Sequence, residues 1–520
     1  MKTRAMMFLL IPVLVGMSIA AQEKTDTGDI VLQEGESKSR AETQAYEPRA
    51  DTQEEKKQGA GFQYDTISRG IPIGFDKYPK REYPLLFNNV LYNLLYRSST
   101  ATAFFTVPAG TIPSALTLES GYSMIERLSD YPVNLLYDKI GTLWTSLIML
   151  TKITFLDFPF AYFMMVFNHE FSGHTMRFHE SAQYIDRITV GVPIPWGLGG
   201  GATSGGIPSS IDQNIFISAA GSEANMVLAH EMDLRFASTG VIYPFDILLY
   251  LNAKFDELLY IDHATGHSTG LRMLADGDFE SYLVLINNKY GRVLPNTYRL
   301  KLDELKRWSY IALADPFLYL ATGALVYNMF TGARYMQAYM IPLGGGASFM
   351  PSARVAFTPN GPECYGDLFF RMQSGATVLA YARAGSKSLR ETWGAGLRLY
   401  TISAGRFVNL GGGLDVYSQP RVMNYMSTYF MENLFWNLYP LGNVNPVSQL
   451  GSLTLYDLAY GYVARGIRRI FGCAAYADIS VKANEFFRAY FRIGYKSSGY
   501  VFGMSLNRGF FWHAGMGFNF

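Results

Sequence analysis

The last third of the chain alternates apolar and polar side chains residue by residue, and this period of two excludes helix there. In ETWGAGLRLY (391–400), Trp393, Leu397 and Leu399 share one face, while Arg398 and the glycines take the other. The same alternation runs through FFRAYFRIGYK, FVNLGGGLDVY, CAAYADISVK, VFGMSLN and WHAGMGFNF. Such runs, separated by turn clusters such as AGSKS and KSSG, predict antiparallel strands with one apolar and one polar face.

Two environments produce this alternation: a soluble sandwich with the apolar side inside, and a membrane barrel with the apolar side facing lipid. The apolar side here is often aromatic, while the other side carries Gly, Arg, Asn and Asp, which suit a wet or polar-packed lumen. The chain also ends on an alternating strand whose side chains Trp512, Met516, Phe518 and Phe520 share one face. A terminal Phe that closes such a strand resembles the C-terminal signal of bacterial outer-membrane β-barrels.

This resemblance implies an outer-membrane-type β-barrel over residues 341–520, with about eight to ten antiparallel strands and little free lumen. The stretch MNYMSTYFMENLFWNLYPLGNVNP (423–446) breaks the alternation, and we expect a long loop or a helical insertion there. The barrel would follow a mainly helical region at residues 62–340. The expected fold class is therefore α+β.

The N-terminus has the pattern of a secretory signal peptide over residues 1–21. Lys2 and Arg4 precede a short apolar core, and the small residues SIAAQ follow. An uncleaved membrane anchor is the alternative, but the apolar core is shorter than the ~20 residues of a span. Residues 22–61 are charged and almost without aromatics, so we expect a disordered linker in an exported protein.

The composition narrows the classes of partner. The formal net charge is +1, from 44 basic and 43 acidic residues, so no feature indicates nucleic acid. Aromatic residues make up 15% of the chain and charged residues 17%, a mixture typical of a membrane protein that contacts lipid. The two cysteines, Cys364 and Cys473, allow one bridge in an oxidising compartment but no disulfide framework.

Residues 83–335 are expected to be mainly helical, because long apolar stretches recur there. The richest, Leu143–Phe167, is interrupted by Lys152, Asp157 and Pro159. A charge at a helix centre is costly in a bilayer, and a clear span needs ~20 apolar residues without interruption. We therefore expect buried helices of a compact region, or helices packed against or inside another element. Membrane spans are the alternative.

The stretch NHEFSGHTMRFHE (168–180) contains the residue types that the site of a zinc hydrolase needs. Such a site needs two or three imidazoles, often a carboxylate, an open position for water and a nearby Glu as general base. His169 and His174, however, are five residues apart, and on a regular helix they would diverge by about 140°. Both can reach one ion only if the helix carries a one-residue π-bulge or ends near Ser172-Gly173.

The segments around this helix resemble the site-2 protease family of membrane metalloproteases. A strand-like piece and a Gly-rich loop (RITVGVPIPWGLGGGATSGG) come next, then SAAGSEANMVLAHEM, then LADGDFESYL. In that family a His-Glu-Gly-His helix is followed by a strand hairpin, a helix with Ala-Gly-Pro-x-Ala-Asn and a helix with Leu-Asp-Gly. Two histidines and the Asp hold zinc, and the Glu is the general base.

Carried over to this chain, the resemblance implies zinc ligands at His169, His174 and Asp276, with Glu170 as the general base. Neighbouring Asp278 competes with Asp276 for the ligand role. A metal ion would then activate water for the hydrolysis of a protein or peptide substrate.

The chain also departs from the family pattern. Gly221 and Asn225 of AAGSEAN match the family's Gly and Asn, but Ser222 stands where the family has Pro, and Ala275 where it has Leu. Glu223 is another alternative for the third ligand, because glutamates on a second helix serve so in other zincins. Family members cut within the inner membrane, whereas this chain carries features of an outer-membrane protein.

Other motifs are weaker. DHATGH presents His263 and His267 at the favourable four-residue spacing but lacks a Glu after the first histidine, so surface or packing roles are favoured. His179 and His230 are expected to be structural. GLGGGATSGG lacks the Gly-Lys-Ser/Thr of a phosphate-binding loop and is expected to form turn backbone or the edge of a substrate cleft.

Three hypotheses follow. The first is an exported zinc metallopeptidase whose helical region is joined to an outer-membrane barrel. The second is a non-catalytic outer-membrane barrel whose helices plug or cap the lumen and whose histidines only pack. The third is a polytopic inner-membrane protease with a periplasmic β domain.

Overall fold

The structure, a computed structural model, describes most of the chain beyond residue 110. By contacts the chain divides into Met1–Gly59 and Ala60–Phe520, and every described residue belongs to the second unit. The predicted signal peptide, the predicted linker and the 423–446 segment lie outside the described residues. The described residues are 82–87, 110–181, 183, 185–191, 200–206, 210–267, 277–291, 299–331, 335–386, 391–422, 469–484 and 487–519.

The first part of the described chain is mainly helical, as predicted. Its helices are α3 (Thr111–Ile140), α4 (Thr142–Lys152), η3 (Ile153–Asp157), α5 (Phe158–Asn168), η4 (His169–Thr175), α6 (Met176–Glu180), α7 (Ile211–Ser218), α8 (Ala220–Thr239), α9 (Pro244–His267), α10 (Asp278–Gly291), α11 (Leu302–Ser309), η5 (Tyr310–Ala314) and α12 (Pro316–Thr331). Two small two-stranded sheets accompany them: the hairpin of β2 (Ile185–Val190) with β3 (Gly201–Gly205), and the pair of β4 (Val241–Ile242) with β5 (Met336–Gln337), which are far apart in sequence.

The second part forms one antiparallel sheet of ten strands, in the order β1-β14-β13-β12-β11-β10-β9-β8-β7-β6. Consecutive strands from β6 to β14 are neighbours, a simple meander that short turns can connect. The strands are β1 (Glu82–Phe87), β6 (Ile341–Gly344), β7 (Ala347–Thr358), β8 (Gly361–Arg371), β9 (Thr377–Gly385), β10 (Trp393–Ser403), β11 (Val408–Pro420), β12 (Arg469–Lys482), β13 (Phe487–Lys496) and β14 (Gly509–Asn519).

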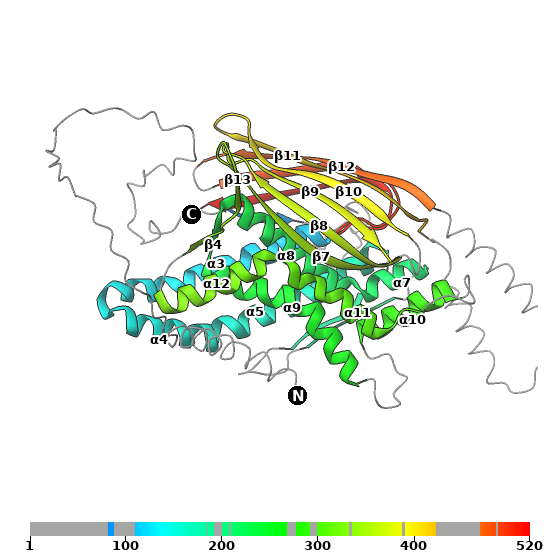
Figure 1. Cartoon of the computed structure of the whole chain (residues 1–520), viewed down its shortest axis with the longest axis horizontal. Coiled ribbons are helices and arrows are strands. Elements are labelled where there is room, and N and C mark those ends of the chain that lie inside the picture. Colours follow the sequence, from blue (N-terminus) through cyan, green and yellow to red (C-terminus); the bar gives the residue numbers. More distant parts are fainter. Residues whose placement is uncertain are drawn as a thin grey trace, which may run out of the picture. The chain divides into compact units, whose positions relative to one another are not determined.

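Within the described residues the sheet is open. β1 and β6 are its two edges, and no pairing joins them. The prediction of a closed barrel at 341–520 is therefore wrong, although the strand count is close. The physical reason is space: a barrel of about eight strands encloses little more than its own side chains. Here helices α8, α11 and α12 pack on that face of the sheet (Figure 1).

The predicted alternation is confirmed, and the apolar side faces outward. On β12, Phe471 is 77% exposed and Ile479 43%, while Ala474 between them in sequence is fully buried. The inward side, which packs on the helices, holds buried charges such as Arg354 and Asp367. This polarity is the reverse of a soluble sandwich, whose sheets bury the apolar face.

Two short stretches differ from expectation. VFGMSLN (501–507) was expected as a strand but forms the connection between β13 and β14. Its apolar side chains are buried because the connection lies between the layers: Phe502 stacks under the Arg354 guanidinium, and Gly503 lies against Ile112 of α3 and Val227 of α8. The other stretch is PLLF (84–87), which lies in the region that was expected to be mainly helical. It forms part of β1, because β14 offers an edge with which it can pair.

Among the described residues, one continuous helix, Leu143–Glu180, is long and apolar enough to cross a membrane. A pair of helices, Leu302–Ala314 and Pro316–Thr331, would do so only if counted together as one broken span, because a bend of 63° separates them. The charges that interrupt the long helix are satisfied within the protein. Lys152 Nζ lies 3.0 Å from Glu126 and 2.6 Å from Asp157. The long helix is thus built to keep these charges buried and paired.

Prediction on the inward face. Arg354 and Asp367 are each 1% exposed and form a two-point ion pair, with distances of 2.7 and 3.2 Å. Arg354→Met strands a buried carboxylate and is expected to lower the free energy of unfolding by about 3–5 kcal/mol. Arg354→Met/Asp367→Leu should recover much of that loss. Urea unfolding in detergent measures both.

Leu397→Ala on the outward face is the control, and it should change the free energy of unfolding by no more than about 0.5 kcal/mol. Equal losses for inward and outward variants would contradict the assignment of faces.

Candidate metal centre

The irregularity that the histidine spacing requires is present. Residues His169–Thr175, HEFSGHT, form a π-helical segment, η4, between α5 and α6. In a π-helix the hydrogen bonds run between residues five apart, so such residues lie above one another on the same face. Gly173 is fitted to this segment, because a Cβ there would overlap with the backbone of Ala220. Of the two irregularities that the spacing allowed, a π-bulge and a helix end near Ser172-Gly173, the structure has the first.

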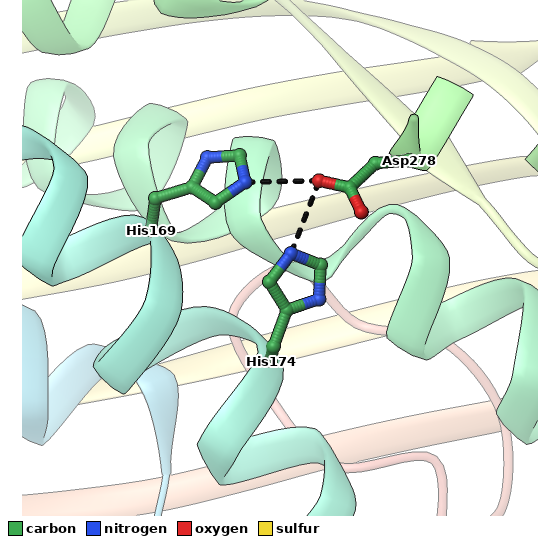
Figure 2. A group of neighbouring side chains, drawn as sticks. All are labelled: His169, His174 and Asp278. Atoms are coloured by element: carbon green, nitrogen blue, oxygen red, sulfur yellow. Dashed lines mark hydrogen bonds and ion pairs between the residues drawn. The ribbon is translucent and has the colours of Figure 1, made fainter. Parts of the chain in front are cut away.

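The π-segment turns both histidines toward the first residue of α10 (Figure 2). The Nε2 atoms of His169 and His174 lie 2.9 and 3.1 Å from the same oxygen, Oδ2 of Asp278. One ligand atom from each of the three residues lies within 4.8 Å of the others. A His-His-Asp group that could hold a metal ion is therefore present.

The donor set fits a transition metal with an open position. Two imidazole nitrogens and one carboxylate oxygen are the ligands of a three-residue catalytic zinc site, which leaves a fourth position for water or substrate. The geometry of His174 supports this. Its Nδ1 lies 2.8 Å from the carbonyl oxygen of Ile217, which can only accept a hydrogen bond, so Nδ1 carries the proton. In the neutral ring the Nε2 lone pair then faces Asp278, as metal binding requires.

Partners around the histidines fix their orientation. His169 Nδ1 lies 3.3 Å from Asp256 Oδ2, which also accepts a hydrogen bond from Asn225 Nδ2 at 2.9 Å. Asn225 in turn accepts one from Asn168 Nδ2 at 2.8 Å. A carboxylate behind a ligating histidine fixes its tautomer and raises its basicity. Asp256, on α9, was missed from the sequence because no motif marks its position.

The histidines act on the Asp278 carboxyl when they are protonated, the state that metal binding would replace. Burial raises the pKa of this carboxyl, but protonated His174 and His169 outweigh burial and hold that pKa below its ordinary value. A carboxyl whose pKa falls on folding stabilises the folded chain above its unfolded pKa, and the contribution is lost as the pH falls. Its backbone N–H also donates to Tyr260 Oη at 3.2 Å, which anchors the start of α10.

Glu170, the predicted general base, is 4% exposed and lies against β3. Thr203 Oγ1 donates to Glu170 Oε2 at 2.7 Å. The backbone of Gly201 approaches so closely that a Cβ there would overlap with the Glu170 side chain. Glu170 also interacts electrostatically with His174. Residues 201–205 of the Gly-rich segment, expected as turn or cleft edge, thus form strand β3 and hold this carboxylate.

Other predicted residues fall elsewhere. Asp276 lies outside the described residues, as do the side chains of His263 and His267 at the end of α9. Glu223 is not part of the group, because its two oxygens accept from Arg177 at 2.8 Å and from the Gly503 N–H at 3.0 Å.

Gly221 packs against the His-His-Asp group, whereas His230 lies away from it, beneath the sheet. The Cα of Gly221 lies against the His169 ring, so a side chain there would overlap with the ligand nitrogen. His230 is buried beneath the sheet, between the rings of Phe369 and Phe502.

Comparisons with protein-family models, curated proteins and solved structures find no match to this chain. A sheet and a set of helices do not by themselves define an activity. The function is therefore inferred from the geometry of the site.

Prediction on the ligand nitrogen. Gly221→Ala places a methyl group on His169 Nε2 and is expected to weaken zinc binding at least tenfold, by analogy with losses on disturbing a ligand's support. Zinc affinity is measured by competition with a chelating dye. The matched control is Gly121→Ala in α3, where a Cβ meets nothing within 4 Å. Equal affinities for the two variants would show that His169 is not a ligand.

Proposed function

We propose that the protein is a zinc-dependent hydrolase of the metallopeptidase type. The observation that carries the proposal is the π-segment, which brings His169 and His174 to one oxygen of Asp278 while Glu170 stands on the same turn. π-Segments are rare and are enriched at functional sites, since they cost regular hydrogen bonding. Packing alone does not require two imidazoles to share one carboxylate oxygen.

Zinc, when bound, supplies a Lewis acid and lowers the pKa of water. His169, His174 and Asp278 would hold it. Glu170 takes the proton of the attacking water, a role for which a positioned carboxylate near the site is suited. Thr203 keeps the Glu170 side chain in one orientation, and Asp256 and the Ile217 carbonyl do the same for the two imidazoles.

The substrate class is a protein or peptide. Support comes from the resemblance to site-2 proteases in the order of segments: the His-Glu helix, the β2–β3 hairpin, the AAGSEAN helix α8 and then α10, which begins at Asp278. The Gly221 and Asn225 positions that match the family both contact the group or its partners. Among the described residues the carboxylate at the histidines is Asp278, and the family-matching Asp276 lies outside them.

The proposed location is the outer membrane, after export by the signal peptide. Its support is the outward apolar face of the sheet, which a soluble protein would bury. The inner-membrane alternative rests on the helix Leu143–Glu180, whose most apolar window is only 17% buried, as a lipid-facing span would be. Within the described residues it is the one continuous helix that passes as a span, and a polytopic protein needs several.

A non-catalytic role has its own supporting observation. The helices pack on the polar face of the sheet and are tied to it by ion pairs, including Arg398 of β10 with Glu231 of α8 at 3.4 Å. In this alternative the helices only stabilise the sheet, and the histidines pack. Zinc binding separates the two functions.

Prediction on zinc and hydrolysis. Purified wild-type protein is expected to hold one zinc ion, measured by atomic emission, and His174→Ala should lose it. Glu170→Gln should keep the zinc and lower peptide hydrolysis by about 10²–10⁴-fold, the range for a missing general base. Unchanged zinc content in His174→Ala would remove the enzyme and leave the packing role.

Prediction on the strand beside Glu170. Gly201→Ala displaces the Glu170 side chain and is expected to lower hydrolysis at least tenfold with zinc content unchanged, because the base but not the ligands moves. Gly200→Ala is the matched control, since a Cβ there meets nothing within 4 Å. Equal activity of the two variants would show that β3 does not position the base.

A further inference from the structure

Apolar side chains form continuous rows across the outward face of the sheet. Each row follows the strand register, so its members are direct neighbours. One row crosses eight strands without a charge: Pro351, Leu368, Ala380, Leu397, Leu414, Ala475, Tyr495 and Phe510. A row three residues further along β7, which faces the helices, begins Arg354, Tyr365, Arg383. The sheet is therefore inside-out along the row of Pro351, whereas Val355 and Phe357, further along the same side of β7, are buried.

The height of the outward apolar face matches a bilayer. On β12 the outward side chains are apolar from Phe471 to Val481, which corresponds to about 33 Å along the strand. At the tilt of about 40° that is usual for membrane strands, this becomes roughly 25 Å, the height of the apolar band of an outer-membrane barrel. A protein partner would not require the outward apolar face of β12 to have this height.

Few backbone groups are left unpaired at the two edges of the sheet. Helix α3 packs along β1, and β6, at the other edge, has only 4 residues, one of them Pro342. Short edge strands that contain proline leave few backbone groups unpaired.

The two ends of the sheet differ. At one end lie the short turns 372–376, 404–407 and 483–486, together with the last residues of β14 and the first of β1. At the other end β7 and β8 are joined by the tight turn 359–360, and the ends of β9 and β10, β11 and β12, and β13 and β14 are separated in sequence by 7, 48 and 12 residues; we call this the long-connection end. In outer-membrane barrels the short turns are periplasmic and the long loops extracellular.

The metal centre lies at the long-connection end. Asp278 begins α10, and Tyr282, about 6 Å further along that helix, donates from its hydroxyl to the carbonyl of Thr358 at 2.9 Å. Lys289 of the same helix donates to the Pro359 carbonyl at 2.7 Å. Thr358 and Pro359 belong to the tight turn after β7. In Figure 1, α7 and α10 lie together at the right-hand end of the sheet.

Helix α8 independently gives the same orientation. Its first turn lies at the metal centre, where Gly221 touches His169. Its other end is Gly240, which lies against Arg371, the last residue of β8 before the short turn 372–376. The helix has 20 residues, or about 30 Å, which equals the thickness of a bilayer's hydrocarbon core. The metal centre and the short turns are thus on opposite sides of that thickness.

We propose that lipid acyl chains cover the outward face of the sheet and that the metal centre lies at its extracellular rim. The substrate class narrows accordingly to polypeptides met from outside the cell rather than from the periplasm. This narrowing of the substrate rests on the proposed hydrolase function, whereas the orientation in the membrane does not.

Membrane-impermeant maleimide labelling of intact cells tests the orientation. In a full-length Cys364→Ser/Cys473→Ser background, Glu391→Cys adds a thiol at an exposed position of the long-connection end, and Ser374→Cys adds one in an exposed short turn. Intact cells should label Glu391→Cys at least tenfold more than Ser374→Cys, and permeabilised outer membranes should label both. Equal or reversed labelling of intact cells, or recovery of the chain in the soluble or inner-membrane fraction, overturns the proposal.

Spin labels in phosphatidylcholine vesicles test the lipid contact. Ala477→Cys in the same background faces outward on β12 and is exposed, whereas Ser374→Cys lies in the turn. A label at 477 should collide more with oxygen than with a water-soluble nickel complex, and a label at 374 should show the reverse. Preference for the nickel complex at 477 overturns the lipid contact. Zinc content of the wild type is measured on the same samples, so failure of the hydrolase proposal is seen separately.

Discussion

The burial of the sheet's polar face against helices is the constraint on which the rest of the structure depends. Arg354, Arg383 and Arg398 are buried there, and each needs a partner that water would otherwise supply. Asp367, Glu363 and the α8 residue Glu231 provide those partners. Arg354–Asp367 and Arg383–Glu363 join neighbouring strands, whereas Arg398–Glu231 joins β10 to α8 and holds that helix against the sheet. Gly221, which meets His169, lies in the first turn of the same helix.

The same helices explain why the sheet stays open. A closed barrel of this strand number has room for side chains but not for helices. The β13–β14 connection fills the space between the layers, with Tyr500, Val501 and Phe502 all at most 2% exposed. The backbone N–H of Gly503 donates a hydrogen bond to Glu223, which lies in the first turn of α8 beside Gly221, the residue that touches His169. The β13–β14 connection thus links the sheet to α8, and α8 in turn contacts the metal centre.

The long helix is irregular at two places, and both carry charged or ligating groups. The long helix Leu143–Glu180 contains two π-segments, η3 and η4. η3 ends at Asp157, which pairs with Lys152, and η4 holds both histidines. Each irregular turn thus carries charged or ligating groups that a regular helix would direct apart. The Gly at 173 allows the second, since α8 passes against it too closely for a side chain.

The sequence by itself determined the strands, their two faces and the need for a distorted helix, because period-two alternation and a five-residue spacing are local properties of the chain. It also singled out His169, Glu170 and His174, and it left Asp276, Asp278 and Glu223 as alternatives for the third ligand. Tertiary structure alone decided that the sheet stays open, that VFGMSLN is a buried connection, and that Asp278 and Asp256, rather than Glu223, approach the histidines. Those outcomes depend on contacts between segments some hundred residues apart, whose register is set by the packing of helices on the sheet and leaves no periodic signal in the sequence.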